Sequence, residues 1–182
     1  MLAVFVNQRG PRKLTLIIRF QVSLMRSIRH PNVLTFYGAG IRSEGGFPYL
    51  VTELMAKGSL KTLLRSKTTK LSWTVRLQFA ADAVGGLRYL HSVGYVHRDV
   101  KADNCFVDGN LRVKVADFGT GRITAKLKQQ NEDRLSLTTA DDVYAEREKT
   151  LSKGTGSPLW MAPELLSGQA IKEGQADRKS VV

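Results

Sequence analysis

Two short runs decide how this chain folds: residues 97–104 read HRDVKADN, and residues 117–119 read DFG. The first run carries an acid, an ammonium group and an amide, which are Asp99, Lys101 and Asn104; Asp117 follows Asp99 by 18 residues. Phosphoryl transfer needs a group that orients and deprotonates the attacking hydroxyl, together with oxygen ligands for magnesium. We therefore expect Asp99 to be the base, Asn104 and Asp117 to be metal ligands, and Lys101 to lie beside the moving phosphoryl group.

Composition narrows the class of protein. The chain has 182 residues, of which 42% are hydrophobic and 24% charged, as is usual for about one soluble globular domain. It contains no run of about 18 apolar residues, so no membrane span is expected. The single cysteine, Cys105, excludes an internal disulfide and favours a reducing, cytoplasmic compartment.

The formal net charge is +12, which raises the possibility of an acidic partner such as nucleic acid or anionic lipid. The basic residues are spread along the chain, with no long cluster and no aromatic interleaving. This spread favours solvated side chains over a nucleic-acid partner. An ATP site would itself use some of the positive charge.

The first third of the chain predicts one helix and one hairpin. Apolar residues at helical spacing predict a helix over residues 14–29, which ends at His30-Pro31 because the residue before proline avoids helical angles. Residues 32–37 and 47–53 predict two strands, and residues 38–46 a turn region between them.

The middle of the chain predicts two helices and a second pair of strands. Ser59 is placed to cap a short helix reaching about Arg65, and Ser72 to cap a longer one reaching about Ser92, with Gly94 as its stop. The expected apolar face of the longer helix consists of Leu77, Ala80, Ala81, Val84, Leu87 and Leu90. Gly85 and Gly86 cost about 1 kcal/mol each relative to alanine but would permit close packing. Residues 105–107 and 112–115 predict strands around a turn at 108–110.

Residues 97–104 and 117–119 resemble the catalytic loop H-R-D-x-K-x-x-N and the D-F-G metal motif of protein kinases. Residues 30–33 resemble the kinase link from helix C to strand 4, and residues 52–55 resemble the gatekeeper and hinge. Residues 58–60 resemble the step into helix D, residues 89–91 the end of helix E, and residues 154–164 the substrate-docking end of the activation segment. The resemblance covers roughly residues 14–166. It is closest to the tyrosine-kinase-like group of serine/threonine kinases.

This resemblance implies an α+β, two-lobed fold that is truncated at both ends. Residues 1–182 would form a partial kinase domain. Residues 14–54 would be the N-lobe remnant, with a partial sheet and helix C. Residues 55–182 would be part of the helical C-lobe, including a long activation segment of 48 residues at 117–164.

The resemblance also implies roles for individual residues. Backbone groups of Glu53 and Met55 would hydrogen-bond adenine, Thr52 would set the depth of the pocket, and Phe106 would lie under the ring. ATP and Mg²⁺ would be the cofactors, held by Lys101, Asn104 and Asp117. An apolar spine would join the two lobes through Met25, Phe36, His97 and Phe118.

Lys101, two residues after Asp99, is the mark of serine/threonine kinases, so a protein substrate with a serine or threonine acceptor is expected. Thr155 resembles the threonine that helps to position this acceptor beside Asp99 and Lys101. Ser136, Thr138, Thr139, Thr150 and Ser152 are candidate phosphoacceptors in the activation segment. A phosphate there brings about −1.5 to −2 charges, for which Arg98 would be the natural partner.

Each of these residues also has a plainer interpretation. Asp99, Asn104 and Asp117 could be loop residues in Asx turns, although three in register make this a poor explanation. Thr52 could be an ordinary strand residue, and Met25 and Phe36 ordinary core. Cys105 is expected to be a small buried hydrophobe rather than a reactive thiol.

Three parts of the kinase pattern are absent or altered. The phosphate loop G-x-G-x-x-G does not precede the readable region. The strand lysine is not evident, since residues 2–5 match V-A-V-K only with Phe5 in the lysine's place, and Lys13 lies in a loop. Gln21 aligns with the helix C glutamate and cannot pair a lysine's charge.

The C-terminal part of the pattern is short as well. In the family, Glu164 usually pairs with an arginine further along, in a stretch that this sequence does not contain. Three functions therefore compete: a serine/threonine kinase, a catalytically impaired pseudokinase-like binding module or fragment, and a nucleic-acid binder. The complete set of Asp99, Lys101, Asn104 and Asp117 favours the kinase.

Overall fold

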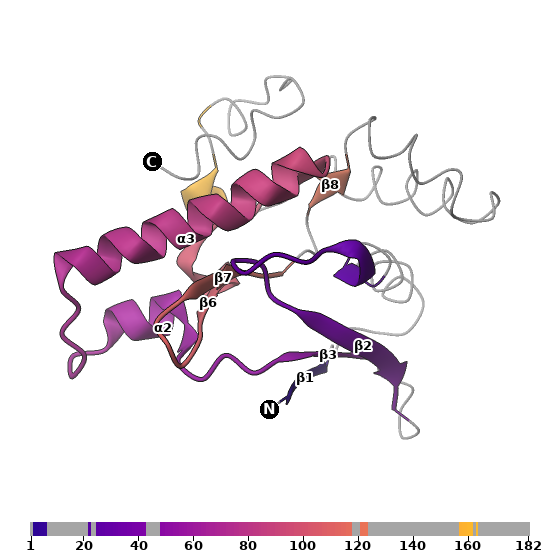
Figure 1. Cartoon of the computed structure of the whole chain (residues 1–182), viewed down its shortest axis with the longest axis horizontal. Helices are drawn as coiled ribbons and strands as arrows, with labels where there is room; N and C mark the ends of the chain where they lie inside the picture. The colour runs from indigo at the N-terminus through magenta and orange to yellow at the C-terminus, as the bar shows by residue number, and fades with distance from the viewer. Residues whose placement is uncertain are drawn as a thin grey trace.

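The computed structural model describes residues 2–6, 22, 25–42, 48–117, 121–123, 157–161 and 163. In this part of the chain a small antiparallel sheet lies on one side and a long helix on the other, with short strands between them (Figure 1). The architecture is mixed α+β, as predicted. No helix among the described residues has both the length and the apolarity that a membrane crossing requires.

The small sheet has the strand order β1-β3-β2. Strand β1 is Leu2–Val6, β2 is Phe36–Ile41 and β3 is Pro48–Glu53. Both pairings with β3 are antiparallel, and Phe36 lies opposite Thr52 while Phe5 lies opposite Leu50. The predicted hairpin between β2 and β3 is therefore confirmed.

The predicted strand at residues 32–37 is wrong in its bounds, because β2 begins only at Phe36 and runs through Gly38 to Ile41. Val33 forms an isolated parallel bridge with Val115 instead. Leu34 donates a 2.9 Å hydrogen bond to the carbonyl of Val115. Residues 32–34 thus pair with a distant part of the chain, which local periodicity does not reveal.

Of the helix predicted at residues 14–29, Val22 and residues 25–27 are helical in the structure. Residues 14–21, with Gln21 among them, lie outside the described residues. Met25 and Ile28 are buried in a core cluster together with Phe36 of β2. The same cluster also contains Val33, Leu87, Leu90, Tyr95, Val100 and Val115.

Two helices follow the small sheet. Helix α2 is Leu60–Arg65 and helix α3 is Trp73–Ser92. The hydroxyls of Ser59 and Ser72 accept hydrogen bonds from the third residue along, Thr62 and Val75, so both predicted N-caps are confirmed. Gly94 follows the C-cap with a φ of 78°, a conformation that glycine adopts without steric cost.

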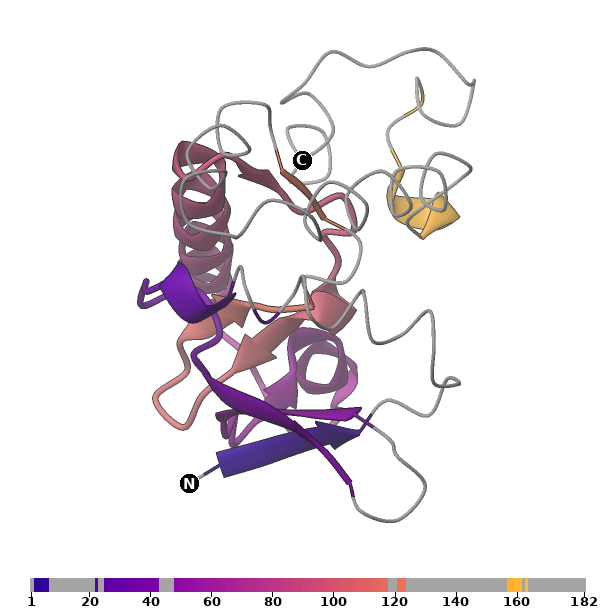
Figure 2. The ribbon, with the colours of Figure 1, turned by 90° about the vertical axis from the view of Figure 1, so that its right-hand side faces the viewer.

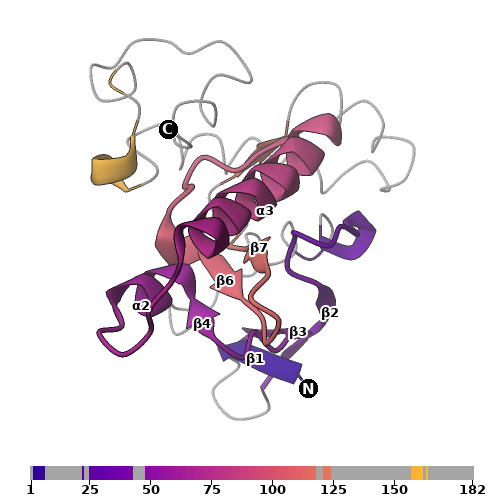
Figure 3. The same ribbon diagram turned by 60° about the vertical axis from the view of Figure 1, so that its left-hand side comes forward.

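A second sheet has the order β4-β6-β7 and lies between α3 and the small sheet (Figure 3). Strand β4 is Gly58–Ser59, β6 is Cys105–Val107 and β7 is Val113–Val115. Strand β5, Tyr95–Val96, pairs with β8, Arg122–Ile123. The predicted pair of strands around residues 108–110 is thus present.

Helix α3 packs closely against residues 32–34. A Cβ atom added at Gly86 would lie 2.3 Å from the carbonyl oxygen of Asn32, and one at Gly85 would lie 3.2 Å from the Asn32 side-chain oxygen. Only residues without a side chain allow this approach. The sequence-based expectation that these glycines permit close packing is confirmed.

The predicted apolar face of α3 is only partly correct. Leu87 and Leu90 are buried, but Leu77 is 67% exposed, Val84 is 45% exposed, and Ala80 and Ala81 are exposed too. The buried side consists of Phe79, Asp82, Gly86, Leu87 and Leu90. A polar residue and a glycine belong to it because this side faces backbone groups of other segments.

Asp82 illustrates the reason. Its carboxylate accepts hydrogen bonds from Arg112 at 2.6 and 2.8 Å and from the Val113 amide at 3.0 Å. Burial alone would raise the pKa of Asp82, but these hydrogen bonds and the Arg112 charge hold it below its ordinary value. The ionised carboxylate therefore joins α3 to the start of β7.

Candidate active site

The predicted base, Asp99, lies in the loop between β5 and β6, where it is only 6% exposed. Its Oδ2 accepts hydrogen bonds from Lys101 Nζ at 2.6 Å and from Asn104 Nδ2 at 3.0 Å. Its Oδ1 accepts one from the Ser157 amide at 3.0 Å. The structure thus brings together Asp99, Lys101 and Asn104 and adds Ser157 to this group.

Ser157 is a residue that the sequence analysis missed. Lys101 Nζ donates a 2.7 Å hydrogen bond to its hydroxyl, so Asp99, Lys101 and Ser157 form one hydrogen-bonded group. Thr155, to which this position beside Asp99 and Lys101 was assigned, lies outside the described residues. The only signal in the sequence was a second hydroxyl two residues further along, just before Pro158.

The charge state of Asp99 follows from these contacts. Burial alone would raise its pKa, but hydrogen bonds from Lys101 and Ser157 and the positive charge of Lys101 outweigh burial. The pKa of Asp99 is therefore below the ordinary value of 3.8. At neutral pH the carboxylate is ionised, which is the form that a base requires.

Asn104 ends a short 3₁₀ turn, η1, at Ala102–Asn104 and is 6% exposed. Its Nδ2 donates to both the backbone carbonyl and the carboxylate of Asp99, at 2.8 and 3.0 Å. These two bonds orient the amide, because only its nitrogen can donate. Within the described residues Oδ1 accepts no hydrogen bond, so a buried oxygen remains for a hard cation.

A backbone hydrogen bond also connects Asn104 to the residue before Asp117. The Ala116 amide donates a 2.9 Å hydrogen bond to the Asn104 carbonyl, and Asp117 is the next residue. The Asp117 side chain is exposed. Asn104 therefore lies directly before β6 and Asp117 two residues after β7, the strand that pairs with β6. An amide with a carboxylate is a suitable donor set for Mg²⁺.

The buried ring of His97 holds this loop in place through hydrogen bonds. It is fully buried, its Nε2 lies 2.8 Å from the Ala116 carbonyl, and its Nδ1 accepts from the Asp99 amide at 3.3 Å. These two contacts assign the ring proton to Nε2. One imidazole thus connects the residue before Asp117 to the backbone of Asp99.

Strained backbone occurs at both motifs. Arg98 has a φ of 68° and Asp117 a φ of 61°, and Leu111, in the turn before β7, is the other described non-glycine residue with positive φ. Left-handed conformations are costly for residues with a Cβ and cluster at functional sites. Their presence beside Asp99 and at Asp117 is therefore consistent with a functional site.

The predicted adenine-contacting residues lie at the end of β3 and after it. Thr52 is 2% exposed and donates a 3.1 Å hydrogen bond to the Glu53 carbonyl. The Met55 carbonyl accepts from the Gly58 amide at 3.0 Å, whereas no hydrogen bond of the Met55 amide is found in the described part of the chain. Phe106 packs against a cluster of Met55, Leu34 and Ala116.

The Glu53 side chain, unlike its backbone, forms an ion pair with Lys114. Its carboxylate accepts hydrogen bonds from Lys114 Nζ at 2.8 Å and from the Thr35 amide at 2.7 Å. Burial would raise the pKa of Glu53, but the bonds from Lys114 and Thr35 lower it below its ordinary value. This ion pair connects the end of β3 to β7.

Ala116 connects the two groups of residues. It packs with Met55 and Phe106, its amide bonds Asn104, and its carbonyl bonds His97. The catalytic-loop residues and the residues expected to contact adenine therefore lie on two sides of one short segment.

The remaining predictions have mixed outcomes. Cys105 is buried and burial raises its pKa to about 11, which confirms the small-hydrophobe interpretation. Met25 and Phe36 share a core cluster, while Phe118 lies outside the described residues. The same applies to Glu164 and to the five candidate phosphoacceptors: Ser136, Thr138, Thr139, Thr150 and Ser152.

Known proteins are similar to the chain over nearly its whole length. The family model described as protein tyrosine and serine/threonine kinase matches residues 6–178. The dual specificity protein kinase shkA of Dictyostelium discoideum is 40% identical over 93% of the chain, and the dual specificity testis-specific protein kinase 1 of Rattus norvegicus is 40% identical over 84%. The chain spans 29% and 22% of the length of these two relatives.

Proposed function

Because the chain belongs to the protein tyrosine and serine/threonine kinase family, we propose that it transfers the terminal phosphoryl group of ATP to a serine or threonine hydroxyl of a protein. The observation that carries this proposal is the buried, ionised Asp99 carboxylate, held by Lys101, Asn104 and Ser157. The narrower resemblance to the tyrosine-kinase-like group stays a prediction.

In the proposed mechanism, Asp99 orients the acceptor hydroxyl and takes its proton as the oxygen–phosphorus bond forms. The bond between the terminal phosphorus and its bridging oxygen breaks, and ADP leaves with that electron pair. Base assistance of this kind contributes about 10²–10⁴-fold to the rate. Lys101, 2.6 Å from Asp99 and 2.7 Å from Ser157, supplies positive charge where negative charge develops.

Asn104 Oδ1 and the Asp117 carboxylate would hold Mg²⁺. When bound, the ion neutralises charge on the phosphates. Lys101 would supply a positive charge to the terminal phosphate. Oδ1 of the buried Asn104 has no hydrogen-bond donor within the described residues, which supports this assignment.

Adenine recognition is proposed for the end of β3 and the segment that follows it. The Met55 amide and the Glu53 carbonyl would bond the polar edge of adenine, Thr52 would limit the depth of the site, and Phe106 would lie under the ring. The burial of Thr52 and the packing of Phe106 with Met55 support these roles.

A pseudokinase-like binding module is the second candidate, and one observation favours it. Strand β1 pairs with β3 where the family's lysine-bearing strand is expected, yet its sequence is LAVFV and contains no lysine. Without that lysine, the phosphates lose one fixed cation. ATP could then bind without being turned over.

The test is Mg²⁺-dependent transfer of labelled phosphate from ATP to a serine- and threonine-rich protein. We expect Asp99→Asn to reduce the rate by at least about 10²-fold. Asp103→Asn is the matched control, because Asp103 belongs to the same loop but forms a half-exposed ion pair with Lys61. Equal activity in wild type and Asp99→Asn would exclude the kinase proposal and leave the binding module.

A further inference from the structure

The end of α2, the loop that follows it and the start of α3 form a basic surface with an exposed indole. We call this set the α2–α3 surface, and it consists of Arg65, Lys67, Lys70, Trp73, Arg76 and Leu77, all of them exposed. Figure 1 shows the loop at the left edge of the molecule, where it joins the two helices. None of these residues has a role in the proposed phosphoryl transfer.

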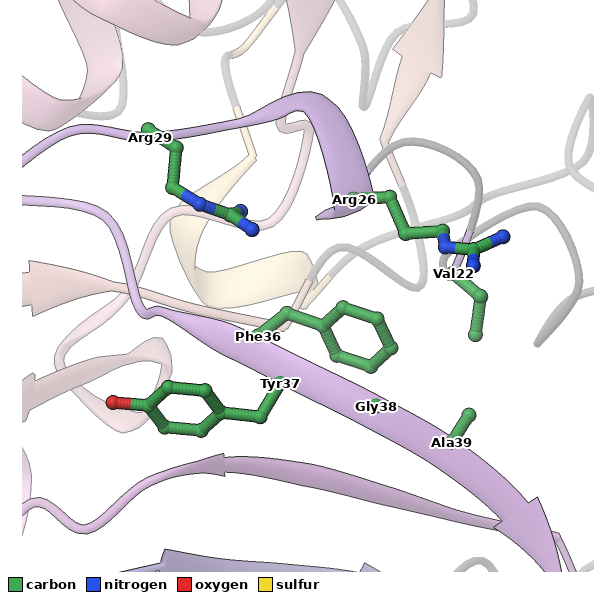
Figure 4. A pocket seen from close by; sticks show the side chains of 7 residues that line it. All are labelled: Val22, Arg26, Arg29, Phe36, Tyr37, Gly38 and Ala39. Carbon is green, nitrogen blue, oxygen red and sulfur yellow. The ribbon is translucent and has the colours of Figure 1, made fainter.

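The α2–α3 surface is separate from the other features of the fold. Figure 2 shows α2 and α3 on the same side of the small sheet β1-β3-β2. The cavity between residues 22–29 and strand β2 is lined by none of the six residues (Figure 4). Any partner of this surface would therefore approach the helical part of the molecule.

The positive charge of this surface is not balanced by carboxylates nearby in the sequence. No acidic residue occurs between Glu53 and Asp82. Arg65, Lys67 and Lys70 form no ion pair within the described residues. Their charges are therefore available to an anion from outside the chain.

The carboxylates that contact the same two helices already have partners. Asp103 forms a 2.7 Å ion pair with Lys61 of α2. Asp82 of α3 is buried and forms a 2.6 Å ion pair with Arg112. Neither carboxylate is thus free to neutralise the α2–α3 surface.

Hydrogen bonds hold the loop that carries the two lysines. The hydroxyl of Ser66 lies 3.0 Å from that of Thr68 and accepts a hydrogen bond from the Thr69 amide at 3.3 Å. Arg76 Nε donates to the Leu71 carbonyl at 3.4 Å, which joins the loop to α3. The basic side chains therefore extend from a backbone that is tied to both helices.

Apolar side chains project beside these charges. Trp73 is 79% exposed, and Leu77, one turn further along α3, is 67% exposed. Residues three and four apart share one side of a helix, and the Arg76 guanidinium lies 5.8 Å from the centroid of the Trp73 ring. One side of α3 thus carries an indole, an aliphatic group and a cation together.

We propose that the α2–α3 surface binds an anionic phospholipid membrane, with Trp73 and Leu77 in the headgroup region and the basic side chains on the charged headgroups. Each Lys or Arg near such a membrane contributes about fivefold to binding. Tryptophan is enriched at this boundary because its ring is apolar and its N–H is polar. Single-stranded nucleic acid fits less well, because it stacks on successive aromatic side chains and Trp73 is the one aromatic residue of this surface.

Co-sedimentation of the full chain with lipid vesicles tests the proposal. We expect saturable binding to phosphatidylcholine vesicles that contain about one third phosphatidylserine, and none to phosphatidylcholine alone. The double variant Lys67→Gln, Lys70→Gln should bind at least about tenfold more weakly. The matched control is Arg42→Gln, Arg88→Gln, an equal charge change at exposed positions after β2 and near the end of α3, which should change the Kd by less than about threefold.

The emission of Trp73 distinguishes entry into the headgroup region from attraction of charges alone. The chain has two tryptophans, so Trp73 is the remaining one in Trp160→Phe. Its emission should shift to shorter wavelength on the anionic vesicles, because the indole leaves water. Trp73→Ala in the otherwise unchanged chain should weaken binding about fivefold. Thermal melts should show that every variant folds.

Three results would each overturn the proposal. The first is equal binding to vesicles with and without phosphatidylserine. The second is a loss of binding in the Arg42, Arg88 control as large as in the Lys67, Lys70 variant. The third is unchanged Trp73 emission on the anionic vesicles. Tighter binding of single-stranded RNA that depends on the two lysines would also overturn it, and would assign the surface to a nucleic acid.

Discussion

At the scale of single residues, the site depends on how Asp99 is held before any substrate arrives. Its two carboxylate oxygens accept hydrogen bonds from Lys101, Asn104 and the Ser157 amide. A carboxylate fixed in this way would need little reorganisation during the proposed reaction. The same contacts determine its protonation state.

The pKa of Asp99 should respond to Lys101. A carboxyl whose pKa is lowered in the folded protein stabilises the fold at any pH above its ordinary pKa. This stabilisation is lost as the pH falls through the lowered pKa. Lys101→Met removes one hydrogen bond and the nearby charge, so the pKa of Asp99 should rise toward or above 3.8. NMR titration of the Asp99 carboxyl carbon measures this shift. An unchanged or lower pKa in Lys101→Met would contradict the assigned cause.

Ser157 should behave as a positioning residue. Ser157→Ala removes the hydroxyl that accepts from Lys101 but keeps the amide that donates to Asp99. We expect kcat to fall about tenfold with little change in the KM for ATP, since one hydrogen bond to a charged group is lost. Ser157→Thr should restore activity. A rise in the KM for ATP at unchanged kcat would instead place Ser157 in nucleotide binding.

At the scale of elements, helix α3 organises the described part of the chain. It is capped by Ser72, it is joined to β7 through Asp82 and Arg112, and it contacts residues 32–34 at Gly86. Through the backbone bonds between Val115 and residues 32 and 34, these contacts reach the segment that carries Ala116 and Asp117. Packing along α3 therefore affects the position of a proposed metal ligand.

Gly86→Ala tests this packing. Its Cβ would lie 2.3 Å from the Asn32 carbonyl, so the backbone must move apart. We expect a loss of about 1–3 kcal/mol in the free energy of unfolding, which is a fall of roughly 2–4 °C in Tm per kcal/mol. Gly109→Ala is the control, because its Cβ would meet no atom within 4 Å. Equal melting temperatures for wild type and Gly86→Ala would show that the helix is not packed as described.

Local elements could be predicted from the sequence where their cause is local. Both helix caps, the stop at Gly94 and the strands around residues 108–110 depend on neighbouring residues, and they are present. The bounds of β2 and the buried face of α3 depend on contacts with distant segments, such as Val33 with Val115 and Asp82 with Arg112. Apolar periodicity contains no information about those partners.

At the scale of the whole molecule, the two motifs were enough to predict an α+β kinase fold, and the family match supports it. Ser157 could not be found in this way, because it reaches Asp99 from 58 residues further along the chain. The convergence of Met55, Phe106 and Asn104 on Ala116 likewise requires the fold. The linear sequence does not show which distant residues become spatial neighbours of a motif.

The central claim is that Asn104 and Asp117 hold the magnesium of a nucleotide bound beside Asp99. Calorimetric titration of the full chain with ATP, in Mg²⁺ and then in EDTA, tests it most directly. Asn110→Ala, a change in the exposed turn before β7, serves as the control for Asn104→Ala. We predict that Mg²⁺ tightens ATP binding at least about tenfold in wild type and in Asn110→Ala but not in Asn104→Ala. Equal ATP affinity of the wild type with and without Mg²⁺ would contradict the account.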